Sequence, residues 1–296
     1  MLLLISASLF LFLRKQNAQK QAFQESKKDT DITVIFTNKL VNYSLKNGKL
    51  DRLNEIGIKI PEDNNHDFSQ FENKVLFSTG HVTSNKNQFR LGILDISNGH
   101  YTEKKRDTLP TTGLGYDKEH FYTMTSKVGS GTEIQQFNTS GEKVKSTRLK
   151  EEGLGIKILG NDDFTFMLSG VENTKYHESI DAKRLTIFDP EKLDIKADHI
   201  LDSVDSDYML GLTDMEIISN KIYFPNTCEH NKKTLADEVS SKLLVYNLDT
   251  KEQSEILLEE NYPTGITKDS KEKNLIIGHE PNQLGKYVFS IYNLET

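Results

Sequence analysis

Several histidines in this chain of 296 residues have a carboxylate directly beside them, a pairing that metal sites and proton-transfer sites both use. They fall in polar stretches between apolar segments. We take the following as binding-site candidates: His81, His177, Glu178, Glu229, His230, His279 and Glu280. A metal site needs roughly three or four such groups to converge, and sequence alone does not show convergence. Cys228 lies two residues before His230 and is expected to be a small buried residue at a strand end.

No motif in the sequence assigns a catalytic residue. The chain has no Gly-x-Ser-x-Gly elbow, no phosphate-binding loop, no paired-cysteine metal motif and no dinucleotide fingerprint. Its net charge of -7 and sequence pI of about 5.7 argue against a nucleic-acid partner, which would require a basic surface. These features favour a binding protein over an enzyme.

A strand-like segment recurs along the chain about every 50 residues. Each copy has apolar residues followed by one polar residue, which we call the marker residue, and then a polar turn. The marker residues are Ser44, Asp95, Asn138, Asp189, Asn247 and Asn293. A repeat of this length, rich in β-branched and aromatic residues, is typical of the blades of a β-propeller.

Each repeat contains other strand signals around the marker strand. An apolar run precedes it, a more polar strand follows it, and four repeats open with a glycine: Gly115, Gly155, Gly211 and Gly265. Glycine suits the crowded axis of a propeller, where backbones approach closely. The first repeat lacks an innermost strand and the last copy lacks an outermost one.

The segment Leu243-Leu244-Val245-Tyr246-Asn247-Leu248-Asp249-Thr250-Lys251 resembles the repeats of WD40 and YVTN-type bacterial β-propellers, although the chain has no tryptophan. We therefore expect an all-β propeller of six four-stranded blades over residues 32–296, with seven blades as the alternative. A six-bladed propeller also resembles the gluconolactonase-like hydrolases, a resemblance that implies a divalent metal ion at the axis. Asp214 and Asn226 are the nearest candidates for its ligands.

Residues Leu2 to Leu13 form an apolar run that is too short to span a bilayer but fits a signal-peptide core. We interpret residues 1–13 as a signal-anchor or signal-peptide-like segment and residues 14–31 as a polar stalk. This predicts a domain on the extracellular side of the cell membrane, or a secreted one. If the positive-inside tendency applies to Arg14 and Lys15, these residues would instead place the domain in the cytoplasm.

The connections between the second and third strands of the repeats are long, and in a meandering blade they all emerge on one face. This face is the expected binding surface. The sequence thus predicts a monomeric, non-catalytic, extracytoplasmic binding or scaffold module that recognises a protein, peptide or glycan. The alternative is a hydrolase or lyase that acts at the central funnel with a bound divalent metal ion.

Overall fold

The computed structural model describes most of the chain. It covers residues 17–25, 27–36, 38–60, 67–71, 73–83, 86–106, 113–127, 131–149, 154–173, 178–203, 207–234, 236–281, 284–286 and 288–295. The apolar run Leu2 to Leu13, with Arg14 and Lys15, lies outside these residues.

The strands form successive antiparallel meanders, which we number 1 to 6 in chain order. Meander 1 contains β1 (Ile32–Phe36), β2 (Lys39–Lys46) and β3 (Lys49–Gly57). Meander 2 contains β4 (Asp67–Phe71), β5 (Lys74–Thr83), β6 (Lys86–Asp95) and β7 (His100–Arg106). Meander 3 contains β8 (Gly113–Tyr116), β9 (His120–Lys127), β10 (Gly131–Asn138) and β11 (Lys143–Leu149).

The second half of the chain continues the pattern. Meander 4 contains β12 (Gly155–Gly160), β13 (Thr165–Asn173), β14 (Glu178–Phe188) and β15 (Ile195–Leu201). Meander 5 contains β16 (Tyr208–Leu212), β17 (Glu216–Ile218), β18 (Lys221–Asn231), β19 (Asp237–Asn247) and β20 (Gln253–Leu257). Meander 6 contains β21 (Pro263–Lys268), β22 (Asn274–His279) and β23 (Phe289–Asn293).

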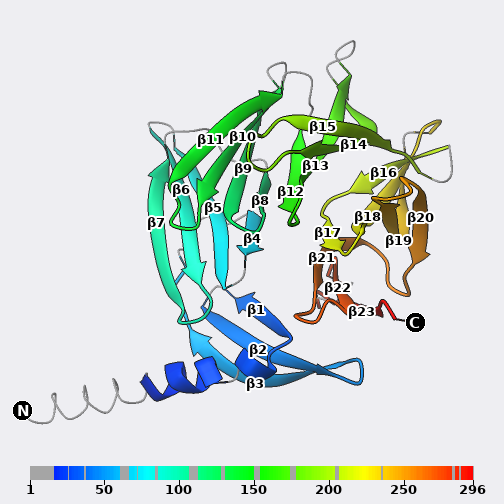
Figure 1. Ribbon diagram of the computed structural model, residues 1–296. Helices are drawn as coiled ribbons and strands as arrows, with labels where there is room; N and C mark the ends of the chain where they lie inside the picture. The colour runs from blue at the N-terminus through cyan, green and yellow to red at the C-terminus, as the bar shows by residue number, and fades with distance from the viewer. Residues whose placement is uncertain are drawn as a thin grey trace, which may run out of the picture.

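The meanders stand around a common centre in chain order, as a β-propeller requires (Figure 1). The marker strands are β2, β6, β10, β14, β19 and β23, which confirms the predicted strand positions. The innermost strands converge so closely that β8 and β12 pair in parallel, and a Cβ on Gly115 would lie 1.5 Å from the carbonyl oxygen of Ile158. Gly265 meets no such crowding, since its nearest neighbour would be 3.8 Å away. The number of blades, six or seven, stays a prediction.

Apolar layers between neighbouring meanders form the core. Phe137 and Leu76 belong to the layer between meanders 2 and 3, and similar layers lie between meanders 1 and 2, 3 and 4, 4 and 5, and 5 and 6. The middle strands are apolar on both faces because each is covered from both sides. Burial of apolar surface in these layers contributes about 25 cal/mol per Å² to the free energy of unfolding.

The junction between meanders 6 and 1 is polar in the part of the chain that the structure describes. Asp31, directly before β1, receives hydrogen bonds from Ser270 N–H to its carbonyl oxygen (3.3 Å) and from Leu45 N–H to its carboxylate (2.7 Å). Lys271 Nζ lies 2.9 Å from the same carboxylate. Burial by itself would raise the pKa of Asp31, but the Leu45 and Lys271 contacts outweigh it and lower that pKa. A charged side chain therefore links the first and last meanders.

The marker residues close the turns between the third and fourth strands. Asn247 Oδ1 accepts hydrogen bonds from the N–H groups of Asp249 (2.9 Å) and Thr250 (3.1 Å). Asp95, Asn138, Asp189 and Asn293 hold the residue two positions on in the same way. Asn and Asp form such turns because their side chains are short acceptors.

Ser44 is the exception among the marker residues. Strand β2 continues past it to Lys46, and the turn is made by Asn47 (φ 50°) and Gly48 (φ 71°), a two-residue hairpin of the type in which both residues have positive φ. The Ser44 hydroxyl oxygen is buried and has no hydrogen-bond partner among the described residues. This residue shares the sequence pattern of the marker but not its role.

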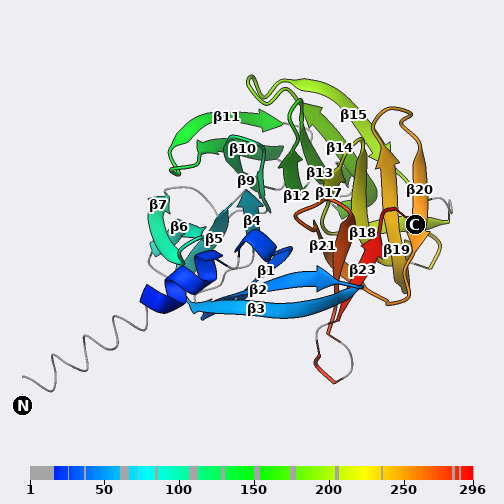
Figure 2. The same ribbon diagram turned by 60° about the horizontal axis from the view of Figure 1, so that its bottom comes forward.

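Part of the predicted stalk packs against the propeller. Residues 17–25 are helical, and a short 3-10 helix, η1 (Lys27–Asp29), follows. Phe23 is fully buried in the apolar layer between meanders 1 and 2, where it lies with Leu40 and Phe77. Figure 2 shows the helix, in blue, beside these two meanders. The stalk boundary of 14–31 therefore includes residues that belong to the folded domain by their burial.

Three of the expected long loops are mostly strand. The β5–β6 ladder extends to the pair Thr83 and Lys86, the β13–β14 ladder to Asn173 and Glu178, and the β18–β19 ladder to His230 and Asp237. In each ladder a short connection joins the two strands. We call the three paired extensions the projecting hairpins. The segments appear loop-like in sequence because they are polar, whereas β structure only requires backbone pairing.

The role of the marker residues is testable by substitution. Asn247→Ala removes two hydrogen bonds and should lower the free energy of unfolding by about 1 kcal/mol, or the Tm by about 2 °C. Asn247→Asp keeps the acceptor and should stay near wild type. Ser44→Ala should not destabilise, because the hydroxyl it removes has no partner. Equal losses for Asn247→Ala and Ser44→Ala in thermal unfolding would contradict the assigned turn role.

Candidate functional site

Three of the predicted binding residues cannot be assigned contacts. His177 lies outside the described residues. His81 is placed in β5 and Glu178 at the start of β14, but their side chains are outside the described part of the structure. Their role on the face of the projecting hairpins stays a prediction.

Glu229 and His230 lie in β18 and are held by neighbours. The buried Glu229 carboxylate is 3.0 Å from Lys242 Nζ, and His230 Nδ1 pairs with Asp237. Burial lowers the pKa of Lys242, but Glu229 and Glu255 outweigh this effect and raise it. These contacts give both residues a structural role within the β18–β19 hairpin.

Cys228 does not extend this group into a reactive site. Its sulfur lies 3.6 Å from His230 Nε2. Burial raises the pKa of the Cys228 thiol, and the negative charge of Asp237 adds to this effect. The thiol is therefore kept protonated, and a protonated thiol is a weak nucleophile and metal ligand.

His279, at the end of β22, is buried and both of its ring nitrogens are engaged. Nδ1 lies 2.8 Å from the Asn261 carbonyl oxygen and Nε2 lies 2.8 Å from Ser290 Oγ. The neighbouring Glu280 is exposed, and its N–H donates to the carbonyl oxygen of Tyr262 (3.0 Å). The pair thus ties β22 to the loop before β21 and to β23.

The two candidate metal ligands, Asp214 and Asn226, have other partners. Asp214 Oδ1 is 3.0 Å from Lys157 Nζ and its Oδ2 accepts a hydrogen bond from Ile266 N–H (3.2 Å). Asn226 is buried and its Oδ1 accepts a hydrogen bond from Gly211 N–H (2.8 Å). Across the described ranges, no three or more His, Cys, Asp or Glu residues are grouped so that they could hold a metal ion.

A cavity of about 840 Å³ lies on the propeller axis. Its wall consists mainly of the turns between the first and second strands of meanders 3 to 6. Successive connections in a meander alternate between its two ends, so these turns and the projecting hairpins are on opposite faces. The cavity therefore opens on the face opposite to the one that loop length predicts.

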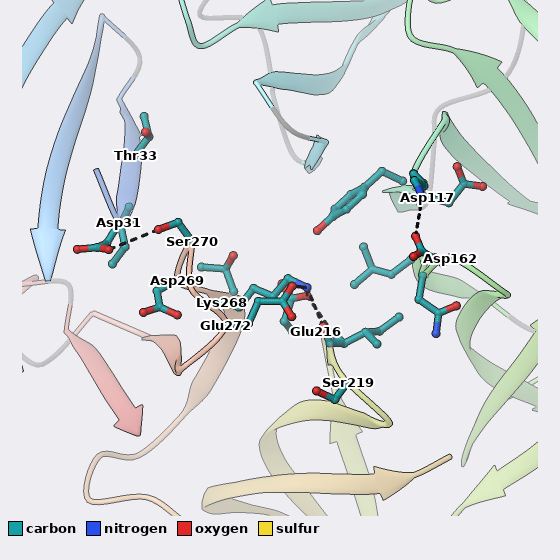
Figure 3. A pocket seen from close by; sticks show the side chains of 18 of the residues that line it. Asp31, Thr33, Asp117, Asp162, Glu216, Ser219, Lys268, Asp269, Ser270 and Glu272 are labelled. Carbon is teal, nitrogen blue, oxygen red and sulfur yellow. Dashed lines mark hydrogen bonds and ion pairs between the residues drawn. The ribbon is translucent and has the colours of Figure 1, made fainter. Parts of the chain in front are cut away.

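Meander 1 contributes to the cavity in a different way from the others. It has no innermost strand among the described residues, and the segment Thr30 to Thr33 lines the cavity in that position. Figure 3 shows Asp31 and Thr33 on one side of the cavity and Asp117 and Asp162 on the other. In the part of the chain that the structure describes, this position beside the axis therefore belongs to the cavity.

Acidic side chains dominate the cavity wall. Seven carboxylates line it against two lysines, Lys118 and Lys268. The carboxylates are those of Asp31, Asp117, Asp162, Asp163, Glu216, Asp269 and Glu272. Concave sites lined by one sign of charge concentrate ligands of the opposite sign.

Some of these carboxylates also shape the turns that carry them. Asp117 Oδ1 accepts hydrogen bonds from Glu119 N–H (2.8 Å) and His120 N–H (2.7 Å). Asp269 Oδ1 holds Lys273 N–H (2.8 Å) and Asn274 N–H (3.1 Å) in the same manner. The local sequence thus folds into tight turns whose first residue is acidic, which brings negative charge to the axis.

Glu216, the first residue of β17, is one of three almost fully buried carboxylates of the cavity wall, with 4% of its surface exposed against 4% for Asp117 and 3% for Asp269. Its Oε1 accepts a hydrogen bond from Ile217 N–H (2.9 Å) and lies 3.9 Å from Lys268 Nζ. Burial raises the pKa of Glu216 from 4.5 to about 7, although the charge of Lys268 acts in the opposite direction. The group therefore changes charge near neutral pH.

Tyr116 from β8 adds a phenol to the same wall. Burial raises its pKa well above the ordinary value, and the negative charges of Glu216, Asp214 and Glu272 raise it further. The phenol therefore stays neutral. An aromatic ring beside carboxylates is the combination that organic cations favour.

The sequence analysis missed this cavity because its residues lie in short polar turns that are individually ordinary. One signal was available: acidic residues recur between the first and second strands, at Asp117, at Asp162 and Asp163, and at Asp269. These turns lie on one face of the propeller because the meanders are stacked around a common axis.

No helix in the described residues has the length and apolar character needed to cross a bilayer.

Comparison with known proteins supports the architecture. No protein-family model matches the chain, and no curated protein matches it. Among solved structures, it is similar to the Pan2 WD40 domain of Neurospora crassa, with a TM-score of 0.51, 9% identity, and coverage of 90% of this chain and 76% of that one. It is also similar to the hydrazine synthase of Kuenenia stuttgartiensis, with a TM-score of 0.57, 10% identity, and coverage of 86% and 80%. The chain thus has a WD40-like β-propeller architecture.

Proposed function

We propose that this protein is a non-catalytic, extracytoplasmic binding module whose axial cavity accepts a cationic group, such as a lysine side chain, from a protein or peptide partner. The observation that carries the proposal is the cavity of about 840 Å³ with seven carboxylates and two lysines in its wall. Propeller folds present such axial openings to ligands, and function depends on the site and not on the fold.

Two of the contacts between opposite charges in the cavity wall are weak enough for a cationic ligand to replace. Lys118 and Asp162 pair at 3.3 Å, but their side chains are 68% and 77% exposed, so the pair contributes little and can be exchanged. The 3.9 Å distance between Glu216 and Lys268 is too long for a hydrogen bond. An incoming ammonium group near Glu216 would favour the ionised carboxylate and would therefore lower its pKa on binding.

The projecting hairpins form a second candidate binding surface, on the face of the propeller opposite to the cavity. A protein, peptide or glycan partner would contact this face at the hairpin β18–β19, where the apolar side chain of Val239 is 52% exposed. The extracytoplasmic location is supported by the apolar run Leu2 to Leu13. Asp214 and Asn226 do not support the alternative of a metal-dependent hydrolase, because they are engaged with Lys157 and Gly211.

A labelled trilysine peptide tests the cavity. Fluorescence anisotropy should show binding to the wild-type protein, and Glu216→Gln should weaken it about 10-fold or more, as expected for the loss of a hydrogen bond to a charged group. Glu259→Gln, an exposed carboxylate outside the cavity wall, is the matched control and should bind like wild type. A triglutamate peptide should not bind. Equal affinities for wild type and Glu216→Gln, or no trilysine binding, would overturn the assignment.

The burial of Glu216 predicts a pH dependence of stability in the absence of ligand. Because the folded-state pKa of about 7 exceeds the ordinary value of 4.5, the folded protein holds a proton in this range that the unfolded chain releases. Stability should therefore fall as pH rises from 4.5 to 7, by roughly 3 kcal/mol from this group alone. Glu216→Gln should lack this contribution in denaturant titrations. Parallel pH profiles for the two proteins would show that Glu216 is not buried as described.

Protease treatment of intact cells that express the full chain tests the proposed location. Trypsin should remove the propeller, detected with an antibody against residues 32–296, while a cytoplasmic marker protein survives. Lysed cells provide the positive control for cleavage. Survival of the propeller until lysis would refute the extracytoplasmic location without affecting the proposed cavity.

A further inference from the structure

Lys268, the last residue of β21 in meander 6, places its ammonium group against meander 5. Its Nζ donates a hydrogen bond to the Ile217 carbonyl oxygen (3.0 Å) and forms an ion pair with Glu272 Oε1. The same Nζ lies 3.9 Å from Glu216 Oε1. All four residues line the axial cavity, and Figure 3 shows Lys268, Glu216 and Glu272 together in its wall. The cavity thus already contains an ammonium group, which the chain itself supplies.

The contacts of Lys268 are those that a primary ammonium group requires. Such a group has three N–H donors and no acceptor, so several oxygen atoms around it hold it best. The carbonyl oxygen of Ile217 is the informative partner, because it binds an N–H donor, whereas a carboxylate attracts any cation. A quaternary ammonium group carries methyl groups in place of N–H donors and cannot form this hydrogen bond. The arrangement therefore favours a primary ammonium group.

The two lysines of the cavity wall differ in their surroundings. The Lys268 side chain is 29% exposed and contacts a backbone oxygen as well as carboxylates. Lys118 is 68% exposed and pairs with Asp162, which is 77% exposed. Exposed ion pairs contribute little to stability, because water solvates both partners. Lys268 therefore occupies a formed site, whereas Lys118 is a surface charge, and the two lysines provide a matched comparison.

The attachment of Lys268 to β21 limits its contact with Glu216. A hydrogen bond from an N–H donor needs a donor–acceptor distance of about 2.7–3.2 Å. The separation of 3.9 Å between Lys268 Nζ and Glu216 Oε1 exceeds this range. An ammonium group on a separate molecule is not held by β21, so it can move closer to Glu216. Such a ligand gains a contact that Lys268 does not make.

On the basis of the cavity function proposed above, we propose that Lys268 occupies the ammonium subsite of the free protein and that an unmodified lysine side chain of the partner displaces it. The ligand class is then a primary ammonium group on an alkyl chain, and Lys268 is an internal competitor for its site. After displacement, Lys268 stays near the other carboxylates of the cavity wall. Its charge is therefore not transferred to an apolar environment, which would be costly.

Chemical rescue of Lys268→Ala tests the subsite without a peptide. The measurements are made at about pH 8.5, above the pKa of about 7 for Glu216 and below the value of about 10.4 for a lysine-like amine. At equal ionic strength, n-butylammonium should bind in the vacated position and raise the Tm of Lys268→Ala by about 2 °C or more. Tetramethylammonium and n-butanol should not.

Wild type and Lys118→Ala are the controls for the rescue, and n-butylammonium should leave the Tm of both unchanged. The control variant removes the same charge from the same cavity wall, but its lysine contacts only exposed surface. No rescue of Lys268→Ala, or an equal effect of tetramethylammonium, would overturn the proposal.

Binding of labelled trilysine at the same pH tests the competition. Lys268→Met keeps most of the apolar stem and removes the ammonium group, so it should bind trilysine at least 10-fold more tightly than wild type. Lys118→Met should change the affinity less than 3-fold. Equal gains for the two variants would show that only the charge of the cavity matters, and would refute the displacement of Lys268.

A peptide of three trimethylated lysines tests the ligand class. It carries the same charge as trilysine but has no side-chain N–H donors, so wild type should bind it at least 10-fold more weakly. Equal binding of the two peptides would show that the Tyr116 ring and the carboxylates select the cation without hydrogen bonds, which would contradict the proposed subsite.

The failure of this proposal and that of the cavity function give different results. Trilysine binding that is lost in Glu216→Gln but unchanged in Lys268→Met keeps the cavity function and refutes the competitor. No trilysine binding to wild type or to Lys268→Met refutes the cavity function and the displacement with it. In that case, rescue of Lys268→Ala by n-butylammonium would still support the ammonium subsite, since the rescue involves no peptide.

Discussion

The apolar layer between two neighbouring sheets is the interaction on which the rest of this structure depends. Each middle strand is apolar on both faces, so a single meander cannot shield itself from water and is stable only between two others. Phe166 and Phe224, from adjacent meanders, belong to one such layer. Stacking in a ring follows from this constraint, and the ring in turn brings the polar turns of several meanders to one axis.

Much of the fold was predictable because its signals are local. The marker residues are visible in sequence because, in meanders 2 to 6, an Asn or Asp closes the marker strand and accepts hydrogen bonds from the N–H groups of the next turn. Asn247 and Asp189 satisfy this rule directly. Ser44 shows its limit: a hairpin with Asn47 and Gly48 can replace the same turn, and pattern alone does not distinguish the two.

The site was less predictable because it is not local. Glu216 and Asp269 are far apart in sequence, and each lies beside an ordinary polar turn; only the ring places them around one cavity. The hairpins were misjudged for a related reason, since polar strands such as the tip of β18 resemble loops in composition. Phe23 is a single aromatic residue in a polar stretch, and its burial depends on a groove formed by residues much later in the chain.

The polar junction at Asp31 has a mechanical consequence. The other interfaces are held by apolar contact, whereas the described residues of this junction are held by hydrogen bonds and one ion pair, and salt screens an ion pair of this kind. Local opening in proteins starts where apolar contacts are fewest. The junction at Asp31 is therefore the point of the ring at which we expect local opening to require the least free energy.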